Sequence, residues 1–156
     1  MLSIDVRQIG SAGVATDGTL DPADPAFDGL LAPFMAPVEV AGTLRLTEGG
    51  DYLWRAHVRA TLGGECRRCL APVEQVVEDD FDVIFSADPD LQEDPSVYPV
   101  PAHATSIDVA WAVREEVTLR ASAFLLCQDA CQGLCPQCGA DLNAGPCRCA
   151  APGLTN

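Results

Sequence analysis

The chain has 156 residues, of which nine are basic, all of them arginine, and 23 are acidic, so the formal net charge is −14. This length fits one domain with a small appendage, and a two-domain enzyme with a deep cleft between its domains is not expected. The acidic excess repels phosphate backbones and anionic lipids, which disfavours DNA and membrane surfaces as partners. No run approaches the roughly 18 apolar residues of a membrane span, and the first residues lack the features of a signal peptide, so a cytoplasmic location is expected.

The N-terminal part is expected to contain little regular structure. Residues 2–9 can form a short strand. Residues 18–33 are rich in glycine, proline and aspartate, which disfavours any long regular element. This second segment is predicted to be a loop or an extended arm.

The clearest periodicity follows, over residues 38–62. Apolar and polar side chains alternate along 38–46, the sequence Glu-Gly-Gly-Asp follows at 48–51, and alternation resumes along 52–62. A period of two places the two sets of side chains on opposite faces of a strand. The pattern predicts an antiparallel hairpin with one face in water.

A third strand is predicted over residues 73–85, with alternating acidic residues on its outer face. Gln75 and Asp79 fall on the apolar face, so we expect a bulge or a frayed half. The residues expected to point inward are Val73, Val77, Phe81, Val83 and Phe85. Residues 86–103 contain four acidic residues and four prolines, and are predicted to form a mobile acidic loop.

One helix is predicted over residues 106–119, capped by Ser106 or Asp108. Its apolar positions would cover the apolar face of the sheet. The expected fold class is therefore α+β, with an antiparallel β-sheet or partial barrel and one covering helix. Residues 1–126 would form this β-rich domain.

Residues 127–151 are predicted to be a cysteine-rich, zinc-ribbon-like tail. Six cysteines lie between Cys127 and Cys149, and too few apolar side chains accompany them to form a core. Cys135-Pro-Gln-Cys138-Gly has the form of a zinc knuckle, in which two sulfurs share one metal ion across a tight turn. Zinc prefers four tetrahedral ligands, so Cys147 and Cys149 are expected to complete this site.

A second zinc site would use the four remaining cysteines, which are Cys66, Cys69, Cys127 and Cys131. This assignment rests on a weaker pattern, because no glycine follows Cys69 and because cysteines four residues apart on a helix can be inert packing residues. An alternative is a thiol redox protein or sensor in which Cys66 and Cys69 cycle between dithiol and disulfide. Metal analysis with thiol counting separates the two hypotheses.

No catalytic arrangement is evident in the sequence. His57 lies on the polar face of a predicted strand and His103 in a proline-rich loop, and neither adjoins a cysteine as a nucleophile pair would require. A zinc ion held by four cysteines has no open position for water, so the sites are expected to support folding. We therefore expect a protein that is not an enzyme.

Basic residues gather on one predicted strand and the turn after it. Arg55 and Arg59 share a strand face with His57, and Arg67 and Arg68 follow between Cys66 and Cys69. Guanidinium groups suit phosphate recognition, so the four arginines are candidate RNA ligands. The alternative is that they pair with the acidic strand beside them, whose acidic residues could also receive a basic ribosomal protein or an assembly factor.

Several motifs together resemble the bacterial YceD family. The resemblance covers about residues 38–149 and is most specific in the tail. It rests on a β-rich acidic segment, Cys66-Arg-Arg-Cys69-Leu before Pro72-Val73, Ile107-Asp108 leading to Val113-Arg-Glu-Glu-Val-Thr-Leu119, Leu134-Cys-Pro-Gln-Cys-Gly139, Asp141-Leu-Asn143 and Cys147-Arg-Cys149.

This resemblance implies a role in ribosome biogenesis, in the accumulation or processing of 23S ribosomal RNA, with no established enzymatic activity. It implies 23S rRNA or its precursor, a ribosomal protein or an assembly factor as partners. The family's cysteine motifs carry over to Cys66, Cys69, Cys135 and Cys138. Its genes neighbour those of a large-subunit ribosomal protein and of phospholipid synthesis.

Overall fold

The computed structural model describes residues 2–10 and 12–149, and the tail residues 150 and 151 lie outside them. Three short 3₁₀ turns occur at Val6–Gln8, Pro25–Phe27 and Leu91–Glu93. The longer elements, in chain order, are β1 (Ser3–Asp5), β2 (Val14–Ala15), β3 (Gly18–Leu20), β4 (Val38–Leu46), β5 (Tyr52–Glu65), β6 (Pro72–Ser86), β7 (Val97–Pro99), β8 (Ser106–Asp108) and α1 (Ala110–Arg120).

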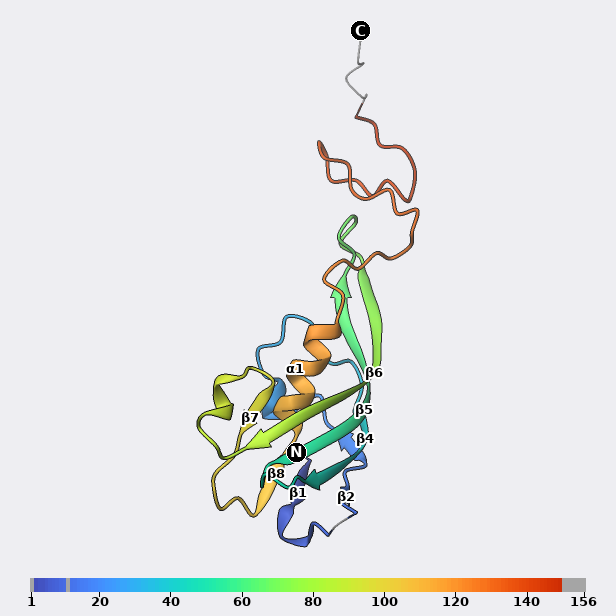
Figure 1. Cartoon of the computed structure of the whole chain (residues 1–156). Helices are drawn as coiled ribbons and strands as arrows, with labels where there is room; N and C mark the ends of the chain where they lie inside the picture. The colour runs from blue at the N-terminus through green and yellow to red at the C-terminus, as the bar shows by residue number, and fades with distance from the viewer. Residues whose placement is uncertain (1, 11, 150–156) are drawn as a thin grey trace.

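The main sheet has the strand order β2-β4-β5-β6-β7, and β3 also pairs with β4. Its pairings are antiparallel except for that of β6 with β7, which is parallel. β1 and β8 form a separate antiparallel pair. With α1 packed beside β5 and β6 (Figure 1), the architecture is the predicted α+β class with a mainly antiparallel sheet.

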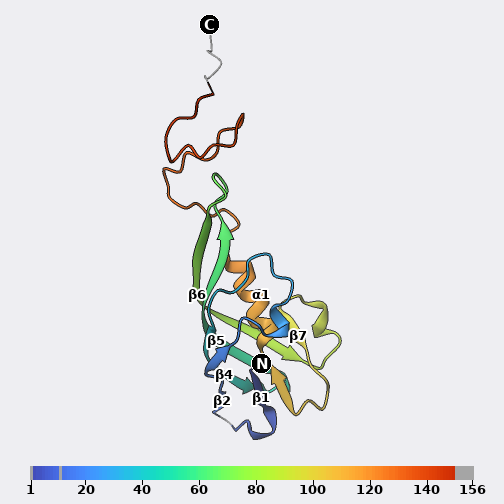
Figure 2. The same ribbon diagram turned by 180° about the vertical axis from the view of Figure 1, so that it is seen from behind.

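The hairpin β4–β5 confirms the period-two prediction. Side chains at even positions of β5 from Trp54 to Leu62 are buried, as expected for one face against a core. β5 and β6 stay paired from Tyr52↔Phe85 to Glu65↔Pro72, whereas β4 pairs with β5 only as far as Arg59. The part of β5 after Arg59 and the part of β6 before Glu78 therefore extend from the body as a two-stranded hairpin, which we call the stalk. The cysteine-rich tail lies at its tip (Figures 1 and 2).

The predicted bulge in β6 is wrong, because β5 and β6 pair residue for residue along their whole length. The two polar side chains on the inner face instead bind the last residue of α1 and the segment that follows it. The Gln75 side chain accepts from the Ser122 N–H (2.8 Å), and Asp79 Oδ2 accepts from Arg120 Nε (2.6 Å). The Arg120 contact lowers the pKa of Asp79. Polar residues fit here because the inner face meets the end of the helix.

The predicted helix begins too early. Residues 106–108 are the strand β8, and α1 starts at Ala110. Backbone pairing with β1 (Ser3↔Asp108) holds this segment extended. Asp108 still supports the helix start, since its Oδ1 accepts from the Ala110 N–H (3.1 Å).

The segments expected to be loops contribute to the core. The arm at residues 18–33 includes β3, and Leu20 and Phe27 are buried. Phe27 packs edge-on against Phe34 with ring centroids 4.5 Å apart. Within residues 86–103, β7 pairs with the end of β6. These short elements close the sheet against α1.

Candidate metal centres

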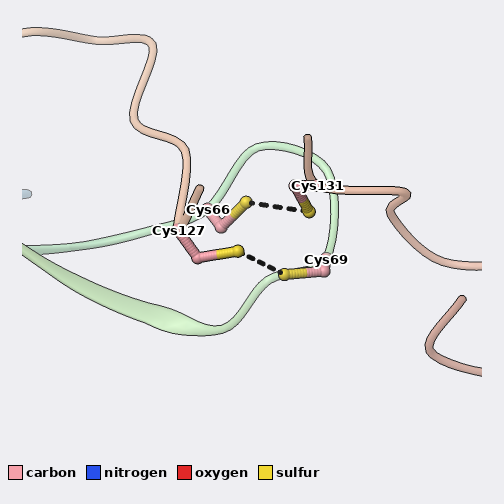
Figure 3. Close-up of side chains that lie close together, drawn as sticks. All are labelled: Cys66, Cys69, Cys127 and Cys131. Carbon is pink, nitrogen blue, oxygen red and sulfur yellow. Dashed lines mark hydrogen bonds between the residues drawn. The ribbon is translucent and has the colours of Figure 1, made fainter. Parts of the chain in front are cut away.

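Four cysteines from two distant parts of the chain meet at the tip of the stalk. Cys66 and Cys69 lie in the loop between β5 and β6, and Cys127 and Cys131 lie in the irregular segment after α1. The Sγ atoms of Cys66 and Cys131 are 3.8 Å apart, and those of Cys69 and Cys127 are 3.6 Å apart (Figure 3). All four sulfurs lie within 4.8 Å of one another. We call this group the first centre.

A second group lies further along the tail. The sulfurs of Cys135, Cys138, Cys147 and Cys149 also lie within 4.8 Å of one another. An isolated antiparallel backbone bridge joins Leu134 and Asp141 here. We call this group the second centre. The structure thus brings together the two sets of four that the sequence spacing suggested, and metal binding by them stays a prediction.

The donor sets fit a metal ion and not disulfides. A disulfide requires sulfurs about 2.05 Å apart, whereas all eight cysteines are free thiols in the structure. Zinc–sulfur bonds of about 2.3 Å place the corners of a tetrahedron about 3.8 Å apart. The sulfur distances in the first centre, 3.6 and 3.8 Å, match that edge. Four thiolates in this geometry are typical ligands of zinc or of iron in iron–sulfur sites.

The two Cys-x-x-Cys loops have the same backbone hydrogen bonds. In the first, the Leu70 N–H donates to the Cys66 carbonyl (2.9 Å) and the Cys66 N–H to the Ala71 carbonyl (2.8 Å). In the second, the Gly139 N–H donates to the Cys135 carbonyl (2.8 Å) and the Cys135 N–H to the Ala140 carbonyl (2.8 Å). Leu70 has a φ of 62° and Gly139 a φ of 72°. A missing glycine therefore did not prevent the first knuckle, because Leu70 adopts the left-handed conformation itself.

Exchanges at these two positions are expected to have opposite effects. Leu70→Gly removes the strain that a side chain causes in the left-handed conformation, which is about 1–2 kcal/mol. Glycine also loses more backbone entropy on folding, which offsets part of this gain. The variant should therefore be as stable as the natural chain or more stable by about 1 kcal/mol. Gly139→Ala should lower stability by about 1 kcal/mol, because the Cβ of alanine is strained in the left-handed conformation that Gly139 adopts. Chemical denaturation of the zinc-loaded chain measures both, and destabilisation by Leu70→Gly would contradict the account.

Backbone N–H groups favour the thiolate form of the first cysteine in each knuckle. Burial raises the pKa of Cys66, but N–H donors from Cys127, Cys69 and Arg68 outweigh it and lower the pKa to about 6. In the second knuckle, N–H groups of Cys138 and Gln137 lower the pKa of Cys135 to about 6.

The pKa values of two other thiols, one in each cluster, shift in the opposite direction. Hydrogen bonds that the Cys127 thiol donates, first to Cys69 and then to Cys131, stabilise its protonated form and raise the pKa of Cys127 to about 12. The sulfur of Cys138 does the same for Cys149, whose pKa also rises to about 12. Without a cation, each cluster therefore opposes ionisation of all four of its sulfurs. A divalent ion among them would remove this opposition.

Arg67 and Arg68 connect the stalk to the tail. The Arg67 guanidinium lies over the Phe124 ring, 4.1 Å from its centroid, and the backbone N–H of Arg67 donates to the Leu125 carbonyl (2.9 Å). Arg68 Nη1 donates to the carbonyl of Cys131 (2.9 Å). These contacts assemble the first centre. They were not anticipated from the sequence, where Phe124 carried no distinguishing pattern, and the RNA contact of both arginines stays a prediction.

Arg55 and Arg59 face acidic side chains of β6. Arg55 Nε lies 3.1 Å from Asp82 Oδ2, and Arg59 Nη1 lies 3.5 Å from Glu78 Oε2. His57 lies between them, with Nδ1 3.0 Å from Asp80 Oδ1. The compact cationic surface considered for RNA is thus interleaved with carboxylates, and the cross-strand pairing considered as the alternative is present. RNA binding at Arg55 and Arg59 also stays a prediction.

An apolar groove of about 840 Å³ lies beside the stalk, where the arm crosses β5. Leu31 is fully exposed at its edge, and Met35 is 54% exposed. Glu65 and Glu74 lie among its lining residues, and neither joins an ion pair within the described chain. No local sequence pattern indicates this groove, because its walls come from separate segments.

A helix long and apolar enough to cross a membrane does not occur among the described residues.

Uncharacterised proteins of Mycobacterium bovis and of two Mycobacterium tuberculosis strains are 34% identical to this chain over 93 residues. The aligned region covers 57% of this chain but only 44% of each relative. No solved structure matches the chain. The sequence profile of the family described as "Large ribosomal RNA subunit accumulation protein YceD" matches residues 54–154, which contain the stalk, α1 and all eight cysteines. Because this match covers more than half of the chain, the chain belongs to the YceD family.

Proposed function

We propose that this chain is a non-catalytic ribosome-biogenesis factor that supports the accumulation or processing of 23S rRNA in the cytoplasm. Family membership supports the role. The single observation that supports the non-catalytic part is the pair of four-cysteine clusters, whose four sulfurs would fill every position around a tetrahedral ion. A metal ion enclosed in this way has no place for water or substrate.

Zinc is the ion we propose for both centres. The first centre would be held by Cys66, Cys69, Cys127 and Cys131, and the second by Cys135, Cys138, Cys147 and Cys149. Zinc bound there supplies a cross-link and positive charge among thiolates. The first centre would fasten the tail to the stalk, and the second would fold the tail into a zinc ribbon.

The direct partner we propose is a basic segment of a protein, such as a ribosomal protein or an assembly factor, with at least one apolar side chain. Charge supports this choice over naked RNA. The net charge is −14, and two of the candidate RNA-binding arginines face carboxylates of β6. Lysine and arginine side chains complement such a surface, whereas phosphates are repelled by it.

The groove beside the stalk is the docking site we propose for this segment. Exposed apolar side chains next to polar ones are typical of protein-binding surfaces. Leu31 and Met35 would contact the partner's apolar side chain. Glu65 and Glu74, which have no ion-pair partner within the described residues, would pair with its cations.

Complementation of cells that lack the protein tests the role and the groove together. A double variant, Leu31→Ser with Met35→Ser, should lower the ratio of 23S to 16S rRNA toward that of cells without the protein. The same variant should bind purified large-subunit ribosomal proteins at least about tenfold more weakly, since anchors at an interface each contribute about 1–2 kcal/mol. Glu65→Gln with Glu74→Gln should act in the same direction.

Leu119→Ser is the matched control, because Leu119 is 78% exposed but lies outside the groove. It should complement fully. An unchanged rRNA ratio in cells without the protein would contradict the proposed role. Full complementation by the groove variants would contradict only the docking site, and binding of protein-free 23S rRNA would identify RNA as the partner.

A thiol redox function is the second candidate, because the pKa of Cys66 falls to about 6. Two observations oppose it. Cys66 is fully buried, and the sulfurs of Cys66 and Cys69 are also in contact with those of Cys131 and Cys127, at 3.8 and 3.6 Å. Rapid alkylation of Cys66 in the purified, reduced chain would support redox chemistry, whereas bound zinc with slow alkylation of all eight thiols supports the structural role.

A further inference from the structure

Asn143 lies in the loop between Cys138 and Cys147, two cysteines of the second centre. Its side chain is held by Asp141, whose Oδ1 accepts from the Asn143 N–H (2.9 Å) and from Asn143 Nδ2 (2.7 Å). Such local bonds fix an asparagine side chain in a turn. The amide group of Asn143 therefore points in a direction set by the fold of the second centre.

This amide reaches the first centre. Asn143 Nδ2 donates to the Sγ of Cys131 (3.4 Å), and Asn143 Oδ1 accepts from the Gln132 N–H (2.7 Å) and, at 3.4 Å, from Gln128 Nε2. A donor to a ligand sulfur spreads its negative charge and fixes its position. Such outer contacts typically change metal affinity by 10–100-fold when they are removed.

The backbone joins the same two centres. The Leu134 N–H donates to the Arg68 carbonyl (3.1 Å), and the Leu142 N–H donates to the Gly133 carbonyl (2.9 Å). Gly133 has a φ of 74°, and a Cβ there would lie 2.9 Å from the Arg68 carbonyl oxygen. The glycine thus permits the close approach of tail and stalk that brings Asn143 to Cys131.

We propose that the two zinc sites are thermodynamically coupled through Asn143, so that zinc in the second centre raises the zinc affinity of the first. The inference rests on the proposed zinc binding. Its physical reason is that the second centre orders the 138–147 loop, which has no apolar core of its own, and the ordered loop presents the donor to Cys131. Coupling of this kind is reciprocal, so zinc in the first centre also tightens the second.

Competition of the full-length chain with a zinc chelator tests the coupling. Removing the second centre by Cys147→Ser with Cys149→Ser should lower the zinc affinity of the first about 10–100-fold. Asn143→Leu should leave two zinc ions bound but lower the affinity of the first centre by a similar factor. In the Cys147→Ser, Cys149→Ser background, Asn143→Leu should have little further effect, because its loop is already disordered.

Gln137→Leu is the matched control, since Gln137 is exposed on the second knuckle; it should change neither affinity. Asn143→Asp provides a second variant in case leucine disturbs the loop, and it should weaken the first centre more, because a carboxylate would face the thiolate. Two zinc ions that bind independently, or equal affinities for Asn143→Leu and Gln137→Leu, would overturn the coupling alone. A wild-type chain unable to take up zinc would overturn the metal proposal and the coupling together.

Discussion

Removal of zinc by a strong chelator under reducing conditions is expected to unfold residues 127–149 and to leave the six-stranded sheet folded. Between residues 122 and 149, the buried side chains with apolar character are those of Cys131 and Cys135. Structural zinc contributes an apparent binding free energy of about 10–16 kcal/mol, far more than two such side chains could supply. Amide hydrogen exchange should therefore become fast in the tail and stay slow in β4, β5 and β6.

Single cysteine variants separate the two centres. Cys138→Ser should reduce the zinc content by about one ion and loosen the ribbon, while the circular dichroism of the sheet stays nearly the same. Cys66→Ser should detach the tail from the stalk as well. Unchanged zinc content in Cys138→Ser would show that the ligand assignment is wrong, and loss of protection throughout the sheet would show that tail and sheet fold as one unit.

Acid should release the zinc in the same way as the chelator. The thiols must be deprotonated to bind, and in the zinc-free chain the pKa values of Cys127 and Cys149 rise to about 12. Protons therefore compete with zinc throughout the neutral range, and zinc affinity should fall as the pH falls. A metal indicator should therefore report increasing zinc release as the pH is lowered from about 8 to about 5, and zinc release that does not increase would contradict the prediction.

The hairpin could be predicted from the sequence because its evidence is local. Alternation from Val38 to Leu62 depends only on neighbouring residues, and the structure retains it except beside the turn, where Leu46 is exposed. The start of α1 could not be predicted, because residues 106–108 are held extended by Ser3–Asp5, about 100 residues earlier in the chain. Local helix preference was overridden there by a long-range backbone pairing.

In the cysteine clusters too, the features that depend on neighbouring residues could be predicted and those that depend on the surrounding fold could not. Short spacings bring Cys135 close to Cys138, so a metal knuckle could be inferred locally. The conformation of Leu70 could not, since its φ of 62° is imposed by the knuckle around it. Likewise, the acidic partners of Arg55 and Arg59 depend on the register of β5 against β6, which the sequence did not specify.

Replacement of Trp54 by alanine is expected to lower the free energy of unfolding of the sheet by about 3–5 kcal/mol, a large part of the 5–15 kcal/mol typical of a domain. Trp54 is fully buried near the start of β5. Its ring packs edge-on against Phe81 at 5.5 Å and tilted against Phe85 at 6.4 Å. Its Nε1–H donates to Thr16 Oγ1 (2.8 Å), which ties the segment between β2 and β3 to β5. Urea denaturation followed by circular dichroism measures the loss.

Trp54→Phe is the matched control, because it keeps an aromatic ring but leaves the buried Thr16 hydroxyl without its donor; it should lower stability by about 1–3 kcal/mol. Neither variant should change the zinc content at neutral pH in the absence of urea, since Trp54 lies near the start of β5, whereas the cysteine-rich tail lies at the far end of the stalk (Figure 1). Loss of zinc from folded Trp54→Ala would mean that the core of the sheet holds the clusters together. Retained zinc would support a boundary near residue 126, with the metal ions stabilising the part of the chain that the apolar core does not reach.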